Sequence, residues 1–229
     1  MKRPIRVTAA LALLLAGPAR AAEPSGPLPL DEVVAEVRAS PGATPTLVTL
    51  SRLSEEARIA LVSRGAIGAA AAPLDRPALR AALDWLVDQI LLVDEAARLE
   101  VFQVEPADVA AEVRRFQERF PSAAEYRAFL ARNGMAEEEL AAVLGRTLRA
   151  ERYVQGRISR AARVSDADVE SAWRAGREEG GRRPLEAQRS AIRARLAEER
   201  TRAELKSLLA ELRARAEVRL LDPLGGPDA

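Results

Sequence analysis

The residues that could carry chemistry in this sequence are its carboxylates, because the chain has no histidine and no cysteine. It therefore lacks the commonest general base and metal ligand, and any thiol nucleophile, disulfide or thiolate metal site. Two acidic groups stand out, the run Glu137, Glu138 and Glu139 and the i,i+4 pair Asp84 and Asp88. The run begins an expected helix, where carboxylates stabilise the positive end of the helix dipole. The pair has no histidine to complete a metal centre, so we expect a solvated face or an interhelical ion pair.

The basic residues do not predict a phosphate-binding or nucleic-acid site. Arg193, Arg195, Arg200 and Arg202 make one side of the last expected helix basic, but glutamates are interspersed among them, as on a solvated face. From these patterns we expect no enzyme activity, no metal, no cofactor and no nucleic-acid partner.

The amino terminus has the pattern of a secretory signal peptide. A positive start with Lys2 and Arg3 precedes an apolar run over residues 7–16, and Ala19 and Ala21 occupy the positions that a signal peptidase reads. An uncleaved anchor is the alternative, although the run is short for a bilayer span. The formal net charge of +1 becomes −3 when the four basic residues of this leader are removed. No later apolar run has membrane-spanning length, so we expect no stable membrane insertion after cleavage.

A wide apolar stripe with helical spacing marks residues 79–99 as the central helix of a helical domain. Its members recur at steps of four and three: Leu79, Leu83, Leu86, Ile90 and Val93. Further apolar residues widen this stripe, so we expect burial on more than one side. Asp75 can cap the helix and Pro77 suits its first turn.

Further helices and strands follow from capping signals and periodicity. Ser51 or Ser54 can begin a helix through Arg64, and Ser122 with Glu125 and Ser165 with Asp168 form capping boxes. The expected helices cover residues 51–64, 79–99, 107–119, 123–132, 137–158, 166–175 and 184–216, and the last carries Glu198–Arg202 and Glu211–Arg215 pairs. A hairpin of residues 33–37 and 46–50 turns at 40–42, and a lone strand at 218–221 is expected to pair with 33–37.

This pattern predicts one mainly helical domain with a small β element. We expect a signal peptide at 1–21, a disordered lead-in at 22–30, a hairpin and helical core at 31–175, a linker at 176–183, a long helix and strand at 184–222, and a tail at 223–229.

The order of these parts resembles the chaperone domain of SurA-like periplasmic proteins, the SurA N-terminal domain family. Four stretches carry the resemblance: DEVVAEV; LDWLVDQILLVDEAARL with VEPADVAAEVRRF; FPSAAEYRAFLARNGMAEEELAAVLGRTLRAERYVQGRI; and VSDADVESAW with AEVRLLD. The resemblance implies a mainly α domain of about six or seven helices, in which the first and last strands pair. It also implies a location in the periplasm.

Three departures limit what the resemblance implies. SurA-like proteins typically carry parvulin isomerase domains between the last two helices, where this chain has about ten residues, too few for an independent domain. Parvulin sites contain histidines, which this chain lacks. The residues from Arg38 to Gly42 also replace the usual Val-Asn-Gly-like turn. The resemblance therefore implies a chaperone module without prolyl isomerase activity.

The leading hypothesis is a holdase that binds unfolded or extended polypeptides, such as outer-membrane protein precursors, in an apolar groove. The candidate peptide-binding residues are the large side chains after the central helix: Phe102, Phe116, Phe120, Tyr126, Phe129 and Met135. Core packing is the alternative interpretation of the same spacing. A secreted helical adaptor whose long helix docks a dedicated partner is the second hypothesis, and a prolyl isomerase is the third.

Overall fold

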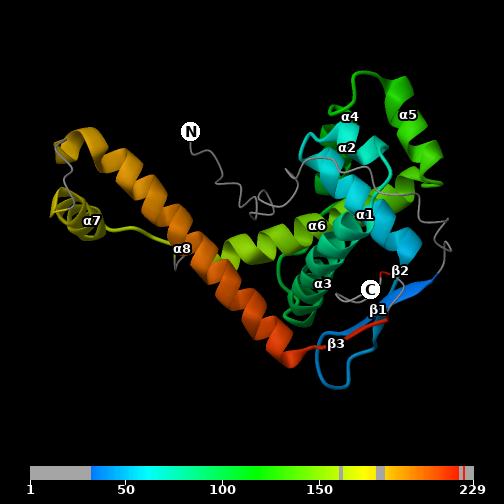
Figure 1. Ribbon diagram of the computed structural model, residues 1–229, viewed down its shortest axis with the longest axis horizontal. Coiled ribbons are helices and arrows are strands. Elements are labelled where there is room, and N and C mark those ends of the chain that lie inside the picture. The colour runs from blue at the N-terminus through cyan, green and yellow to red at the C-terminus, as the bar shows by residue number, and fades with distance from the viewer. Residues whose placement is uncertain (1–31, 160–161, 179–183, 222–223, 225–229) are drawn as a thin grey trace.

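The computed structural model describes residues 32–159, 162–178, 184–221 and 224. Within these ranges the chain is mainly helical with one small antiparallel sheet (Figure 1), as the sequence predicts. The elements are β1 (Val33–Arg38), β2 (Thr46–Thr49), α1 (Leu50–Ser63), α2 (Ile67–Ala71), α3 (Arg76–Arg98), α4 (Pro106–Gln117), α5 (Ala123–Arg132), α6 (Glu137–Ile158), α7 (Asp166–Glu178), α8 (Leu185–Arg215) and β3 (Glu217–Leu220).

Helix α3 is the centre of the larger hydrophobic core. The Asp75 carboxylate accepts a hydrogen bond from the Ala78 amide at 2.9 Å and so caps its first turn. The helix packs against α1, α6 and α8, which confirms the expected burial on more than one side. Its buried residues are Leu79, Leu83, Leu86, Val87, Leu91, Leu92 and Ala96.

The sheet joins the two ends of the described chain. Its strand order is β2-β1-β3, and both neighbours run antiparallel to β1. Ala35 faces Leu220 and Val37 faces Val218, so the predicted pairing of the last strand with the first is confirmed. Val37 and Ala35 are fully buried against α3 and the other members of the larger core.

Helix α8 has two halves with different neighbours. Near β3, Leu208 and Leu212 are buried in the larger core, and the Arg213 Nε donates to Asp88 Oδ1 at 2.6 Å. The expected interhelical ion pair of Asp88 is therefore present. Farther from β3, the helix projects from the body with α7 beside it, and we call this pair of segments the arm (Figure 1).

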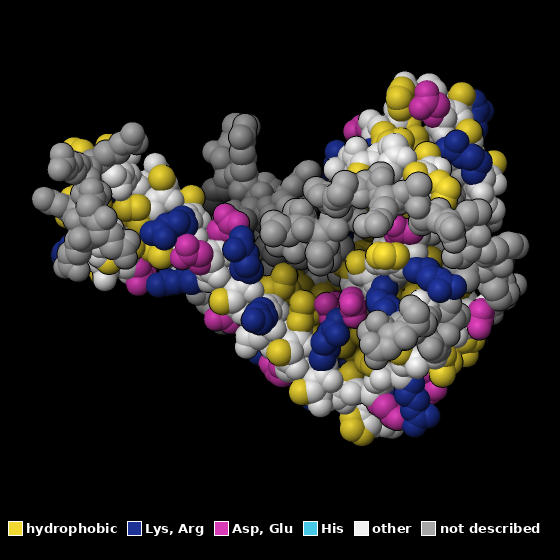
Figure 2. Space-filling model, in the orientation of Figure 1, with side chains coloured by type: hydrophobic (Ala, Val, Ile, Leu, Met, Phe, Trp, Pro, Cys, Tyr) yellow, Lys and Arg dark blue, Asp and Glu magenta, His cyan; other side chains and the backbone are white. Residues whose placement is uncertain are grey.

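Short ion pairs hold α7 against α8. Asp168 lies 2.9 Å from the Arg200 guanidinium, and Asp166 accepts from Arg189 at 3.2 Å and also from Arg193. The predicted capping box is present, because the Ser165 amide and hydroxyl each donate to Asp168 at 2.8 Å. Charges of both signs lie along the arm (Figure 2). The predicted solvated face is present at Arg195 and Arg202, which are exposed, whereas Arg193 and Arg200 are half-buried in ion pairs with α7.

Several boundaries differ from the sequence prediction. Helix α1 begins at Leu50 because the Thr49 hydroxyl caps it, two residues before Ser51, the nearer of the two predicted caps. A short helix, α2, replaces the expected loose connection, so the described residues hold eight helices instead of six or seven. Arg215 pairs with Glu95 across to α3, at 3.4 Å, and the predicted Glu211–Arg215 pair is wrong.

Other predictions fall wholly or partly outside the described residues. Helix α7 continues to Glu178, so residues 176–178 of the predicted linker are helical, and 179–183 lie outside the described ranges. The signal peptide at 1–21 and the lead-in at 22–30 also lie outside them. The tail at 223–229 does too, apart from Leu224, which is buried in the larger core. In the described ranges, no helix combines the length and apolarity needed to cross a membrane.

We predict that acid loosens the arm before it unfolds the body. The Arg200 guanidinium and the two hydrogen bonds from Ser165 hold the pKa of Asp168 well below its usual value of 3.8. A carboxylate with a lowered pKa stabilises the fold above its unfolded-state pKa, and this stabilisation is lost as the pH falls below about 4 and through the lowered value. In a Trp85→Phe variant, Trp173 fluorescence should report this change.

The matched control is Trp173→Phe, in which Trp85 on α3 reports on the body. The Trp173 transition should begin at higher pH than the Trp85 transition, and Asp168→Asn should loosen the arm already at neutral pH. Coincident transitions of both reporters, unaffected by Asp168→Asn, would contradict this account of the arm.

Candidate functional site

Five of the six predicted peptide-binding residues lie in a second hydrophobic core. Phe116, Phe120, Tyr126, Phe129 and Met135 are each less than 10% exposed and pack with side chains from α1, α2 and α6. The four aromatic rings contact one another, with centroids 5.3–6.5 Å apart. The structure thus places these five in the core packing that was the alternative interpretation, and their contact with a client stays a prediction.

Phe102 is the exception, and it lies in an unusual loop between α3 and α4. Its side chain is 38% exposed, and Leu99 and Val101 beside it are also exposed. Glu100 and Phe102 both have positive φ angles, of 52° and 55°. Residues other than glycine rarely adopt this backbone conformation. The loop thus presents three apolar side chains in a backbone conformation that has an energetic cost.

Contacts with α6 hold this loop in place. The Phe102 ring lies directly over Gly156, where a Cβ atom would collide with it, and it meets Tyr153 edge-on with centroids 6.2 Å apart. Arg152 donates to the Gln103 carbonyl at 3.1 Å and pairs with Asp108 at 2.8 Å. The same guanidinium holds the pKa of Asp108 below its usual value. The loop is therefore fastened to α6 on both sides of Val104.

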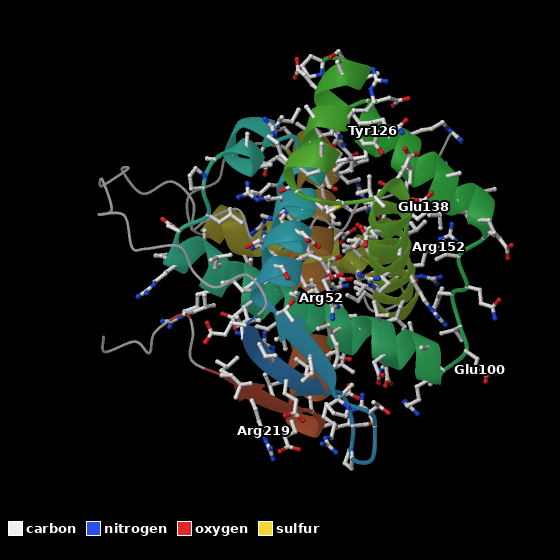
Figure 3. The ribbon with its side chains drawn as sticks, turned by 90° about the vertical axis from the view of Figure 1, so that its right-hand side faces the viewer. Arg52, Glu100, Tyr126, Glu138, Arg152 and Arg219 are labelled. Atoms are coloured by element: carbon white, nitrogen blue, oxygen red, sulfur yellow. The ribbon has the colours of Figure 1, made fainter. Side chains whose placement is uncertain are left out.

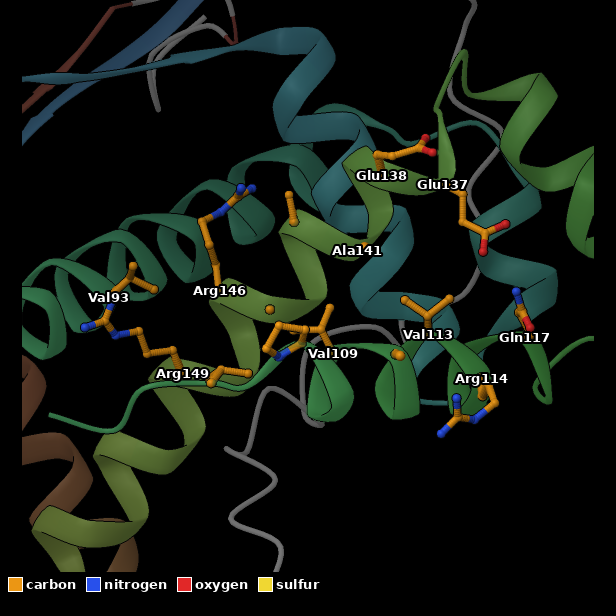
Figure 4. Close-up of a pocket in the computed structure, with 15 residues that line it drawn as sticks. Val93, Val109, Val113, Arg114, Gln117, Glu137, Glu138, Ala141, Arg146 and Arg149 are labelled. Atoms are coloured by element: carbon orange, nitrogen blue, oxygen red, sulfur yellow. The ribbon is translucent and has the colours of Figure 1, made fainter.

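A groove of about 940 Å³ continues from this loop between α4 and α6 (Figure 4). Its apolar surface comes from valines and from small residues on two facing helices, so no bulky side chain fills it. The residues that line it are Val93, Val104, Pro106, Val109, Ala110, Val113, Arg114, Gln117, Glu137, Glu138, Ala141, Ala142, Gly145, Arg146 and Arg149.

Charged side chains of both signs surround the groove. Glu137, Glu138 and Arg114 lie on one side of the central valines, and Arg146 and Arg149 lie on the other (Figure 4). Glu138 and Arg114 have no ion-pair partner among the described residues, and both are exposed. They are therefore available to charges on a bound molecule.

The two arginines on the other side are fixed by the body. Arg146 donates to the Glu56 carboxylate at 3.1 Å, and Arg52 donates to the same oxygen at 2.9 Å. Glu56 is only 5% exposed, so this paired charge ties α6 to α1 from within the core. Arg149 donates to the Ala96 carbonyl at the end of α3, at 3.2 Å. This side of the groove is thus rigidly positioned.

The loop and the groove belong to one face of the molecule. In Figure 3, Glu100, Arg152 and Glu138 follow one another along the same side. Val104 and Pro106 line the groove and lie within four residues of Phe102. We call the surface from Phe102 through Val104 to Val109 the apolar strip; Val113, at its end, is 8% exposed and belongs to the second core.

This face can bind a molecule through apolar contacts in the groove and through charges of both signs at its rim. Among the residues that the structure describes, no three acidic, histidine or cysteine side chains gather as a metal site would require. Glu137 to Glu139 begin α6, as predicted, and the Glu139 carboxylate accepts a hydrogen bond from the Ala136 amide at 2.8 Å. Their presence is therefore explained by helix capping, with Glu138 left free at the groove.

Sequence reasoning missed the groove because its residues are small and its two walls are separated in the chain. One signal was present: Ala141 and Gly145 lie four residues apart on α6, opposite Val109 and Val113 with the same spacing on α4. Small residues facing valines leave space where larger side chains would interlock. No protein family, curated protein or solved structure was found to match this chain.

We predict that Phe102 and Gly156 are energetically coupled. Alanine normally stabilises a helix interior over glycine by up to about 1 kcal/mol. Here Gly156→Ala should fail to stabilise the protein, because the new methyl group displaces the Phe102 ring. In a Phe102→Ala background the same change should be stabilising. Thermal and urea unfolding of the four proteins would give the coupling energy, expected at about 1 kcal/mol or more.

Equal effects of Gly156→Ala in the two backgrounds would contradict the described position of the ring. The matched control is Gly145→Ala, because Gly145 lies in α6 like Gly156, whereas Gly176 lies near the end of α7. A Cβ at position 145 would lie at an ordinary 3.4 Å from Val109, so that variant should not be coupled to Phe102.

Proposed function

We propose that the protein is a holdase chaperone that binds unfolded or extended polypeptides on the apolar strip, without isomerase activity. The observation that carries this proposal is the open groove of about 940 Å³ with an apolar floor and charges of both signs at its rim. Its volume lies within the range of ligand-binding clefts. Because it offers few directed polar groups, it favours apolar segments of varied sequence over one small molecule.

The exposed loop supports the same function. Leu99, Val101 and Phe102 extend the apolar floor beyond the groove, so a bound chain could contact side chains over a longer path. The backbone conformation at Glu100 and Phe102 has a cost that ordinary loop closure does not require, and such costs are frequent at binding sites. The rim supplies Glu138 and Arg114, which have no ion-pair partner among the described residues, and charges of both signs suit clients with interspersed charges.

The proposed location and clients rest on the sequence. The signal-peptide pattern and the resemblance to SurA-like chaperones favour the periplasm and outer-membrane protein precursors. The absence of histidine and of an inserted parvulin domain favours binding without prolyl isomerisation. The adaptor hypothesis has less support, because buried Leu208 and Leu212 of α8 pack within the chain itself and α7 covers part of the remainder.

We predict that two charges on the groove floor abolish holdase activity. Ala110 and Ala142 are exposed residues that line the groove from α4 and α6, so replacing both by glutamate should leave the fold intact. The experiment measures light scattering as a denatured outer-membrane β-barrel protein is diluted into buffer with the chaperone. The wild type should suppress aggregation, and the Ala110→Glu, Ala142→Glu variant should lose at least several-fold in potency.

Ala210→Glu is the matched control, an exposed alanine of α8 outside the groove, and it should suppress aggregation like the wild type. Undiminished suppression by the groove variant would contradict the assigned site. Absence of suppression by the wild type, or measurable turnover of a prolyl peptide, would contradict the proposed function.

A further inference from the structure

The two edges of the sheet differ in how they are protected. At the β2 edge, Arg52 donates from its guanidinium to the Leu47 carbonyl at 3.3 Å, and the strand continues directly into α1. The β3 edge has no lysine, proline or bulge to protect it, and its protection is limited to its four-residue length and the charges of Glu217 and Arg219. All four residues of β3 are exposed.

The hydrogen-bonding groups of β3 alternate between β1 and the outside. The Leu221 amide donates to the Val34 carbonyl at 3.0 Å, so residues 221, 219 and 217 direct their backbone groups toward β1. Val218 and Leu220 face Val37 and Ala35 at the alternate positions, so their own N–H and C=O groups point away from the sheet. No backbone partner for these groups occurs among the described residues.

The side chains at this edge are also incompletely covered. Val218 and Leu220 lie on the same face of the sheet as buried Val37 and Ala35, yet they are 36% and 66% exposed. The core-facing side of the sheet therefore continues past the last strand and ends in open apolar side chains. An added strand would extend both the hydrogen-bond ladder and this apolar face.

The charged side chains on the opposite face of β3 indicate which strand can pair with this edge. Glu217 and Arg219 lie two residues apart and already pair with each other at 2.6 Å. When two copies of β3 run antiparallel with Val218 opposite Val218, each Glu217 faces the Arg219 of the second copy. A shift that sets Val218 opposite Leu220 instead places the two Arg219 side chains opposite each other, which is unfavourable. The strand is thus self-complementary in one register.

We propose that a second copy of this chain pairs with β3 in that register, giving a two-fold symmetric dimer with a continuous six-stranded sheet. The interface is isologous, as in most homodimers. Because β3 has only four residues, the buried area is small and the dimer is expected to be weak and concentration-dependent. This inference does not depend on the chaperone proposal, since it uses a different surface.

The experiment is sedimentation equilibrium over a wide concentration range, with far-ultraviolet circular dichroism as the check on folding. The wild type should approach twice the monomer mass at high concentration. Val218→Pro should remain monomeric, because it removes an outward N–H that β1 does not use. A wild type that stays monomeric throughout, or a dimer that Val218→Pro leaves unchanged, would overturn the proposal.

Charge reversal tests the register. Arg219→Glu and Glu217→Arg should each weaken dimerisation, because each places like charges opposite one another. An equimolar mixture of the two variants should regain dimers, since each strand then faces its opposite. Within one chain Glu217 lies opposite Arg38 and Arg219 opposite Glu36 of β1, so each reversal also opposes like charges on β1. Recovery of dimers in the mixture, in which each variant still carries that cost, separates a charge effect between copies from loss of the strand. Failure of the mixture to dimerise would overturn this register.

Discussion

The antiparallel pairing of β3 with β1 is the constraint on which the remaining structure depends. It joins residues near position 35 to residues near position 220, and so fixes the end of α8 against α3. Leu208 and Leu212 complete the larger core from α8, and Arg213 meets Asp88 of α3. Because α8 is much longer than the face it covers, its other half leaves the body and is stabilised by α7.

The groove exists because the large side chains are buried in the second core while small side chains line the groove. The aromatic residues of α4, α5 and their connection fill the second core, where Phe116 and Phe129 are almost fully buried. Where α4 packs against α6, Val109 faces small residues such as Ala141 and Gly145, and an open groove runs along this contact. The buried Glu56, paired with Arg146, holds one wall of that groove to the body.

The helices, the strands and the pairing of the last strand with the first could be predicted from the sequence, because helix caps and apolar periodicity are local signals. Asp75 marks α3, Ser165 and Asp168 mark α7, and the lone strand at residues 218–221 had one evident partner. The candidate site was less predictable, since helical spacing does not distinguish an aromatic residue in the core from one in a groove. Of the six predicted residues, only Phe102 is exposed. Its position depends on a contact with Gly156, which is distant in the chain and cannot be predicted from a local sequence pattern.

Hydrogen exchange of the chain with and without a saturating unfolded client tests the central claim most directly, that the face between α4 and α6 receives the client. The account predicts added protection in α4, in the loop around Phe102 and in the first half of α6, with no change in the outer part of the arm. Protection confined to α7 and the outer half of α8, or no change anywhere while the client is bound, would contradict it.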